Sequence, residues 1–150
     1  MIYLGILSVV FSTYIGYCFS KKLTRRKNFA GCFFSFNQKL KREVGFSRKS
    51  LLLLTNEEKD SDFIKLLKKA VFEGKCEKPY FLSKDDFELF ENYADFIGKS
   101  DALSQINYFT AISDTIKKTW DNAKENEEKL RPLYLKLGFF AGLAVTVILL

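Results

Sequence analysis

The side chains that most often perform catalysis are missing or isolated in this sequence. There is no histidine among the 150 residues, which excludes a Ser-His or Cys-His nucleophile and an imidazole-bound zinc ion. The three cysteines are an odd number, with Cys18 inside the uncharged N-terminal segment, so they predict no disulfide framework. Cys32 and Cys76 are expected to be small buried side chains or idle thiols. No glycine-rich phosphate-binding loop occurs. The sequence therefore predicts no catalytic, metal-binding or cofactor-binding residues, and we expect a protein that is not an enzyme.

One group of acidic residues has the spacing of a binding surface. Glu88, Glu91 and Asp95 are separated by three and then four residues, so on a helix they project from one face as an acidic stripe. Like charges this close on a helix cost roughly a few tenths of a kcal/mol per pair, a penalty that a basic partner would reverse. Two interpretations stay open. The stripe is either a solvated face that keeps the domain soluble, or a docking face for a partner whose association weakens with salt.

The segments that must position these carboxylates are helical, because their hydrophobic residues recur at helical rather than strand spacing. Residues 22–44 are predicted to form a helix that continues from the N-terminal segment, and residues 63–71 and 83–97 form amphipathic helices. A short apolar helix over 47–54 and a long helix from about residue 100 complete an all-α bundle of about five helices. The predicted core residues are Phe29, Phe33, Phe36 and Leu40, then Phe63, Leu66, Leu67, Ala70 and Val71, then Phe87, Phe90, Ala94 and Ile97, and finally Ile106, Phe109, Ile116, Trp120 and Ala123.

The ends of these helices are predicted from glycine, serine and proline residues. Gly45 is expected to interrupt the first helix, and Gly74 is expected to end the helix over 63–71. Ser83, with Asp86 three residues later, is a near variant of the capping box and predicts a helix start. Pro132 is expected to mark a bend or a restart of the last helix.

Both ends of the chain are hydrophobic and uncharged, from Ile2 to Phe19 and from Leu137 to Leu150. A helix of about 18 residues is roughly 27 Å long, close to the thickness of a bilayer core. The alternatives are a cleaved export signal at the N-terminus and a buried helix at the C-terminus. We predict membrane spans at 1–20 and 133–150, with Lys136 extending to the lipid headgroups, and a cytoplasmic helical domain at 21–132.

Small residues recur every four positions in both predicted spans. Ser8, Ser12 and Gly16 have this spacing in the first span, and Gly138 and Gly142 form a GxxxG pair in the second. Small side chains at this spacing let helix backbones approach closely, which is how spans pack in lipid. We predict that the two spans associate through these residues, or that neighbouring subunits do so in a homo-oligomer. The alternative is coincidence in an apolar run that contains glycine.

A basic stretch follows the first span and predicts the orientation. Positive residues close to a span stay on the cytoplasmic side, so we expect the domain in the cytoplasm, both termini outside, and contact with anionic membrane lipids. From Lys21 to Lys49 the only acidic residue is Glu43. Nucleic-acid binding is the rival explanation of such a stretch, but the membrane tether already accounts for it and we expect none. The juxtamembrane basic residues are Lys21, Lys22, Arg25, Arg26 and Lys27.

The layout and two short motifs resemble the stage III sporulation protein AB family of endospore-forming bacteria. Gly98-Lys99-Ser100-Asp101 followed by Gln105 resembles the family pattern Gly-x-Ser-Asp-x-x-x-Gln, and Lys136-Leu137-Gly138 leads into a span that contains glycine and alanine. The first motif is either a capped connection between two helices or a direct contact with a partner. The N-terminal half departs from the family pattern, because it is rich in phenylalanine and lysine.

The resemblance implies a function as well as a fold. The family belongs to the mother-cell part of a channel complex between mother cell and forespore. Its soluble domain is similar to cytoplasmic domains of the platform protein of type II secretion and type IV pilus machines, which contact a cytoplasmic ATPase and other membrane proteins without a cofactor. We therefore expect a non-enzymatic scaffold in the mother-cell membrane around the forespore that docks a secretion-type ATPase. The alternative is a membrane-tethered regulatory or nucleic-acid-binding module that uses residues 21–49.

Overall fold

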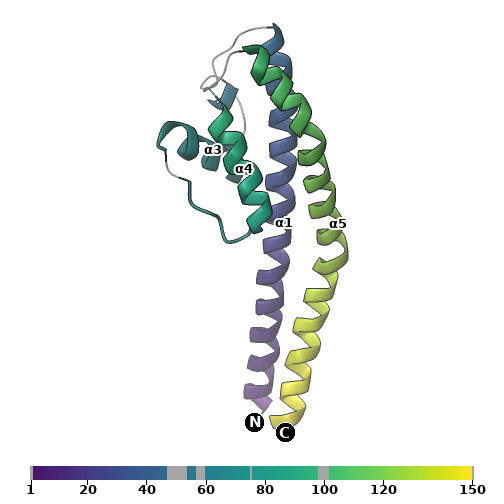
Figure 1. Ribbon diagram of the computed structural model, residues 1–150. Coiled ribbons are helices and arrows are strands. Elements are labelled where there is room, and N and C mark those ends of the chain that lie inside the picture. Colours follow the sequence, from purple (N-terminus) through teal and green to yellow (C-terminus); the bar gives the residue numbers. More distant parts are fainter. Residues whose placement is uncertain (1, 47–53, 57–59, 75, 98–101, 150) are drawn as a thin grey trace. The chain divides into compact units, whose positions relative to one another are not determined.

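The computed structural model describes residues 2–46, 54–56, 60–74, 76–97 and 102–149 (Figure 1). Its elements are α1 (Ile2–Phe46), α3 (Asp62–Phe72), α4 (Lys84–Phe96) and α5 (Ala102–Leu149). A helical turn lies at residues 54–56. No strand occurs within the described ranges, and the prediction of an all-α fold is confirmed.

The chain forms two compact units, and both α1 and α5 contribute to each of them. The hairpin unit consists of Met1–Lys27 and Asn122–Leu150, and the bundle unit consists of Asn28–Asp121. In the hairpin unit, the purple beginning of α1 and the yellow end of α5 lie side by side, with both termini at the same end (Figure 1). In the bundle unit, α1 packs against α3, α4 and α5 through aromatic side chains.

Phenylalanine builds the core of the bundle unit. The ring of Phe33 lies 5.1 Å from that of Phe63 on α3 and 4.7 Å from that of Tyr93 on α4, measured between centroids. Full burial of such a side chain contributes about 1.5–3 kcal/mol, and a well-oriented ring pair adds about 0.5–1.5 kcal/mol. The predicted core of α1 is confirmed, because its four residues are all buried: Phe29, Phe33, Phe36 and Leu40.

A buried polar contact fixes how three helices of the bundle unit meet. Asn37 of α1 is fully buried, and its side-chain amide donates to the carbonyl oxygen of Phe109 on α5 at 3.1 Å. The Tyr93 hydroxyl of α4 donates to the other end of the same amide at 3.3 Å. Burial, followed by the proximity of Tyr108, raises the pKa of Tyr93 well above its ordinary value, so the hydroxyl keeps its proton. Buried polar groups must be paired. Both hydrogen bonds form only when Asn37, Phe109 and Tyr93 lie at the same level, so they fix the relative positions of α1, α4 and α5 along their axes.

Serine residues start two of the helices. Ser83 accepts a hydrogen bond from the backbone N–H of Asp86 at 3.1 Å, which confirms the predicted start of α4. Ser61 caps α3 in the same way, by accepting from Ile64 N–H at 3.3 Å. After α3, Gly74 has a φ of 65°, a left-handed conformation that glycine adopts at little cost.

Two predictions about helix ends are corrected in part. Gly45 does not interrupt α1, because the helix includes it and ends one residue later, at Phe46; one glycine inside a helix costs only about 1 kcal/mol relative to alanine. Pro132 lies inside the continuous helix α5, so of the two predicted outcomes, a bend or a restart, the restart is excluded. The predicted helix over 47–54 lies mostly outside the described residues, and so does the turn that contains Gly98, Ser100 and Asp101.

Candidate functional site

The two helices of the hairpin unit contact each other backbone to backbone at small residues. A Cβ atom added to Gly16 would lie 2.5 Å from a carbonyl oxygen of α5, and one added to Gly138 would lie 2.8 Å from the carbonyl oxygen of Ser12. A Cβ atom on Gly142 would lie 2.6 Å from the Cα atom of Val9. Such distances are far below van der Waals contact, so these positions accept only glycine without movement of a helix. We call this line of contact the seam.

Hydroxyl groups join the seam near the two termini. The Oγ atom of Ser8 lies 3.1 Å from Oγ1 of Thr146, and it donates to the Gly5 carbonyl oxygen at 2.8 Å. Thr146 Oγ1 also lies 3.0 Å from the Gly5 oxygen and 2.9 Å from the Gly142 oxygen. Interhelical hydrogen bonds of this kind contribute about 0.6 kcal/mol each in membranes. Thr146 was not predicted from the sequence, although it continues the four-residue spacing of Gly138 and Gly142.

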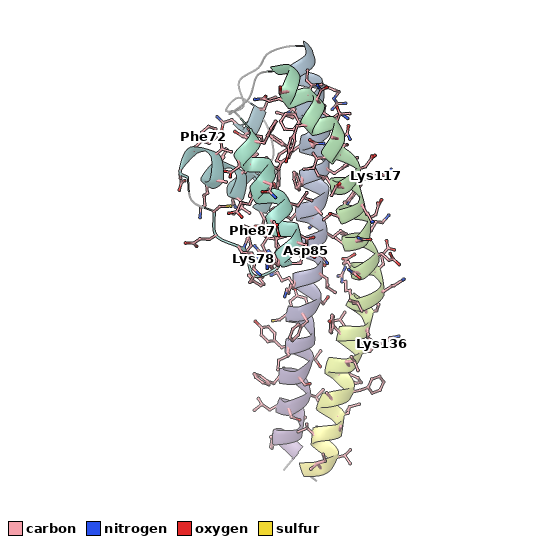
Figure 2. All side chains as sticks on the ribbon, in the orientation of Figure 1. Phe72, Lys78, Asp85, Phe87, Lys117 and Lys136 are labelled. Atoms are coloured by element: carbon pink, nitrogen blue, oxygen red, sulfur yellow. The ribbon has the colours of Figure 1, made fainter. Side chains whose placement is uncertain are left out.

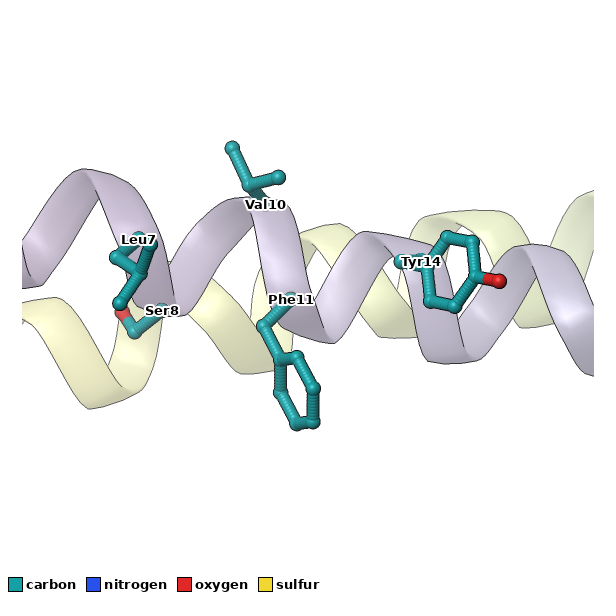
Figure 3. Close-up of a pocket in the computed structure, with 5 residues that line it drawn as sticks. All are labelled: Leu7, Ser8, Val10, Phe11 and Tyr14. Atoms are coloured by element: carbon teal, nitrogen blue, oxygen red, sulfur yellow. The ribbon is translucent and has the colours of Figure 1, made fainter.

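The outer surface of the hairpin unit is apolar. On α1, the exposed residues Leu7, Val10, Phe11 and Tyr14 line a shallow groove together with Ser8 (Figure 3). An exposed apolar surface of this extent is typical of a membrane or protein interface. The large exposed residues on the α5 side are Leu133, Leu137, Phe139, Phe140, Leu143, Val145, Val147 and Ile148.

One helix of the described part of the chain, Ser104–Ile148, is long and apolar enough to cross a membrane by length and composition. Only 6% of its most apolar 18-residue stretch is buried. The core helix of a soluble protein would be mostly buried. This finding agrees with the second predicted span. The first span stays a prediction.

The ends of the two predicted spans lie at nearly the same level of the hairpin. Gly16 faces Tyr134, and about two helical turns farther along the hairpin Thr24 faces Glu127. By interpolation, the end of the first span at residue 20 faces residues 130–131, within one turn of the predicted start of the second span. A flat membrane surface would therefore meet both helices at their predicted boundaries.

Glu127 is the centre of a polar cluster just beyond this level. Its carboxylate accepts hydrogen bonds from Lys27 Nζ at 3.1 Å, Thr24 Oγ1 at 3.0 Å and Arg131 Nη1 at 3.2 Å. Glu127 is only 6% exposed. Burial alone would raise the pKa of the carboxyl, but the hydrogen bonds from Lys27 and Thr24 and the two positive charges outweigh it and hold the pKa below its ordinary value. Glu127 is therefore ionised at neutral pH.

The predicted juxtamembrane basic residues are not equivalent. Lys21 and Lys22 are exposed, whereas Arg25, Arg26 and Lys27 are half-buried. Lys27 forms the ion pair with Glu127 described above. Lys21 and Lys22 are therefore the residues of this group that are best placed to meet lipid headgroups.

The predicted acidic stripe lies on α4 in the bundle unit, where Glu88, Glu91 and Asp95 are all exposed. Glu91 and Asp95 line a hollow between the end of α3 and α4, together with Cys76. Burial, and then the charges of Glu91 and Asp95, raise the pKa of the Cys76 thiol. The thiol is therefore protonated and poorly nucleophilic at neutral pH.

The residues of the turn motif are not brought into a site by the described part of the structure. Gln105 lies on the first turns of α5 and is half-buried. Gly98, Ser100 and Asp101 lie outside the described residues. Their function as a capped connection or as a partner contact stays a prediction. Within the described residues, no group of His, Cys, Asp and Glu side chains could hold a metal ion.

These features define a class of protein: an all-α protein whose hairpin unit indicates association with a membrane. The family model of stage III sporulation protein AB matches residues 52–150, and the chain belongs to that family. The resemblance inferred from sequence motifs is thereby confirmed, and with it a role in sporulation. The family is not a known enzyme family. Comparison with curated proteins gives no match, and neither does comparison with solved structures.

Proposed function

We propose that the protein is a non-enzymatic, membrane-anchored scaffold of the sporulation channel between mother cell and forespore, and that it docks a cytoplasmic secretion-type ATPase. The observation that best supports this function is the hairpin unit. Its two helices pack on each other through glycine and hydroxyl residues and leave apolar side chains on the outside. Such a hairpin would serve as a self-contained anchor, and the family match supports a sporulation role for the chain that carries it.

The proposed docking face for the ATPase is the acidic stripe of α4. Glu88, Glu91 and Asp95 are exposed on one helix, and two of them border a hollow that an arginine or lysine side chain of a partner could enter. Electrostatic docking of this kind mainly speeds association and weakens with salt. The resemblance to platform proteins supports an ATPase as that partner.

The remaining partners follow from the hairpin unit. Other membrane proteins of the channel would contact its outer apolar surface, because the seam is already filled by the chain's own helices. A homo-oligomer would have to use the same outer surface or the bundle unit. The rival function, nucleic-acid binding through residues 21–49, is weakened because Lys27 is paired with Glu127 inside the hairpin.

The docking face can be tested by co-purification from sporulating cells. Replacement of Glu88, Glu91 and Asp95 by lysine reverses the charge of the face without touching the core. We expect the triple variant to remain folded in the membrane but to lose the ATPase at low salt. Recovery of the ATPase with the parent should fall as the salt concentration rises.

A matched control separates this face from a general effect of charge. Asp114 and Asp121 are exposed carboxylates on the α5 part of the bundle unit, and lysine at both positions should leave co-purification intact. If the triple variant retains the ATPase as well as the parent, the docking face lies elsewhere. If the control variant loses it equally, overall charge and not this face governs the association.

A further inference from the structure

We propose that the groove on α1 is a binding site for an anionic phospholipid, with the acyl chain along the groove and the phosphate at Lys21 and Lys22. This inference rests on the proposed function, in which α1 begins inside the membrane. It adds a specific lipid partner and the residues that select it.

The first argument is the continuity of one helix face. Leu7, Val10 and Tyr14, which line the groove, follow one another at steps of three and four, so they lie on one side of α1. The same steps lead from Tyr14 to Cys18 and then to Lys21 and Lys22, all of which are exposed. An apolar groove and two positive charges therefore lie on one face of α1. The groove can contact the acyl chain of a lipid while the two lysines contact its phosphate.

The second argument is length. Leu7 and Lys21 are 14 positions apart, which corresponds to about 21 Å along a helix. The hydrocarbon core of one leaflet is roughly 15 Å deep. A lipid whose phosphate lies at Lys21 would thus place the end of its acyl chain in the groove between Tyr14 and Leu7.

The third argument is the position of the Tyr14 hydroxyl. The ring lies along α1, and its hydroxyl is on the side away from Leu7, toward the basic residues (Figure 3). Within the described residues no hydrogen bond of this hydroxyl is observed. A hydroxyl exposed in the apolar part of a membrane needs an acceptor, and the ester oxygens of a phospholipid provide one at this depth.

The charges of Lys21 and Lys22 favour a lipid over a second copy of the chain as the occupant of the groove. A second copy that packed on this groove in the same orientation would bring its own Lys21 and Lys22 against the first pair, and like charges repel. An anionic phosphate is instead attracted, at about 1 kcal/mol for each lysine near the surface. The occupant that fits both the groove and the charges is therefore an anionic phospholipid.

Native mass spectrometry of the full-length protein in a mild detergent tests this site. Phosphatidylglycerol and phosphatidylcholine with identical acyl chains are titrated separately, and the bound lipid is counted. We expect tighter binding of phosphatidylglycerol. Lys21→Gln together with Lys22→Gln should lower its affinity about thirtyfold and leave phosphatidylcholine unchanged.

Two matched controls accompany these variants. Lys117→Gln with Lys118→Gln removes another adjacent exposed pair, on α5 in the bundle unit (Lys117 is labelled in Figure 2), and should leave both affinities unchanged. Val10→Trp fills the groove and should weaken both lipids, whereas Val147→Trp, at an exposed position of α5 outside the groove, should weaken neither. Helix content by circular dichroism verifies that each variant is folded.

The outcomes separate this site from the proposed function. Equal binding of the two lipids, or parental affinity in the Lys21 and Lys22 variant, overturns the lipid site. An equal loss in the Lys117 and Lys118 variant also overturns it, because binding would then depend on total charge. In those cases, retention of the chain in membranes after an alkaline carbonate wash would still support the proposed membrane anchor. Release of the parent chain by that wash would refute the anchor and the lipid site together.

Discussion

Glu127 has an environment that its position in the sequence does not indicate. It lies between Glu125 and Glu128 on α5, and sequence alone gives no reason to distinguish the three. Glu125 and Glu128 are exposed, whereas Glu127 faces α1 and accepts hydrogen bonds from Thr24 and Lys27. Only the neighbouring helix determines which carboxylate is buried, so this residue could not have been identified from the sequence.

We expect Glu127→Gln to lower the free energy of unfolding by about 1 kcal/mol. Glutamine preserves the shape but removes the charge that Lys27 and Arg131 face. The hairpin is only two helices thick, so water stays near the cluster, and its contribution should resemble that of a strong surface pair more than that of a deeply buried one. Thermal melting of the full-length protein in detergent measures the effect. Glu128→Gln is the control, because Glu128 is exposed, and its melting temperature should match the parent's.

The same cluster predicts a pH dependence of stability. The pKa of Glu127 is lowered in the folded protein, so its contribution is fully present above the ordinary pKa of glutamate, about 4.3. It is lost as the pH falls through the lowered pKa of the folded state. The difference in melting temperature between the parent and Glu127→Gln should therefore be constant near neutral pH and disappear in acid. A difference that grew in acid would contradict the assignment.

Asn37 shows a residue that the sequence could have revealed. It lies four positions after Phe33 and directly after Phe36, so it is a polar residue within an apolar stripe. A polar residue in that position must find a partner when buried. The sequence does not contain the identity of that partner, because Phe109 and Tyr93 come from distant parts of the chain.

At the scale of the helix, predictions succeeded where local chemistry determines the result. The start of α4 depends on Ser83 and the backbone of its own first turn, and the sequence predicted it. The end of α1 depends on whether packing outweighs the cost of Gly45, and the sequence alone cannot weigh these two terms. The same applies to Pro132, which α5 includes without a break.

The seam between α1 and α5 predicts the effect of a single substitution. Gly142→Ile places a branched side chain where a Cβ atom already lies 2.6 Å from Val9 Cα, so the helices must separate. A disulfide engineered between Ser8→Cys and Thr146→Cys, with Cys18 replaced, reports on their distance. We expect its yield to fall strongly in the Gly142 variant.

Ala144→Ile is the control for this experiment. Ala144 is exposed, so a larger side chain there should point away from α1 and leave the disulfide yield unchanged. An unchanged yield in Gly142→Ile would mean that the seam does not hold the helices together. An equal fall in both variants would indicate a general loss of the α5 helix.

For the whole molecule, the central prediction concerns topology. We expect the bundle unit in the cytoplasm and both termini outside, because the basic residues after the first span are retained inside. A cysteine introduced at the exposed Asn56, in a chain without its three natural cysteines, should resist a membrane-impermeant reagent in intact cells. It should react after permeabilisation. Ready labelling of this cysteine in intact cells, before permeabilisation, would refute the topology.

The architecture was predictable to the extent that it depends on periodicity. Helical spacing indicated an all-α fold, and the core of α1 was identified residue by residue. The division into units was not predictable, because it follows from contacts between about the first and the last fifth of the chain. The predicted boundaries at residues 20 and 133 concern the membrane and not these contacts, and they stay predictions.

The seam has a consequence for how this anchor can change over generations. A single nucleotide change in the first two bases of a glycine codon always introduces a larger side chain or a stop. At Gly16, Gly138 and Gly142 there is no room for one, so most first mutations at these codons are harmful. Outward residues away from the α1 groove, such as Phe140 and Val147, face no such limit, and one apolar side chain can replace another. The glycines of the seam are therefore constrained to remain glycine, whereas the residues of the outer surface can change. Partners that bind the outer surface must adapt to those changes.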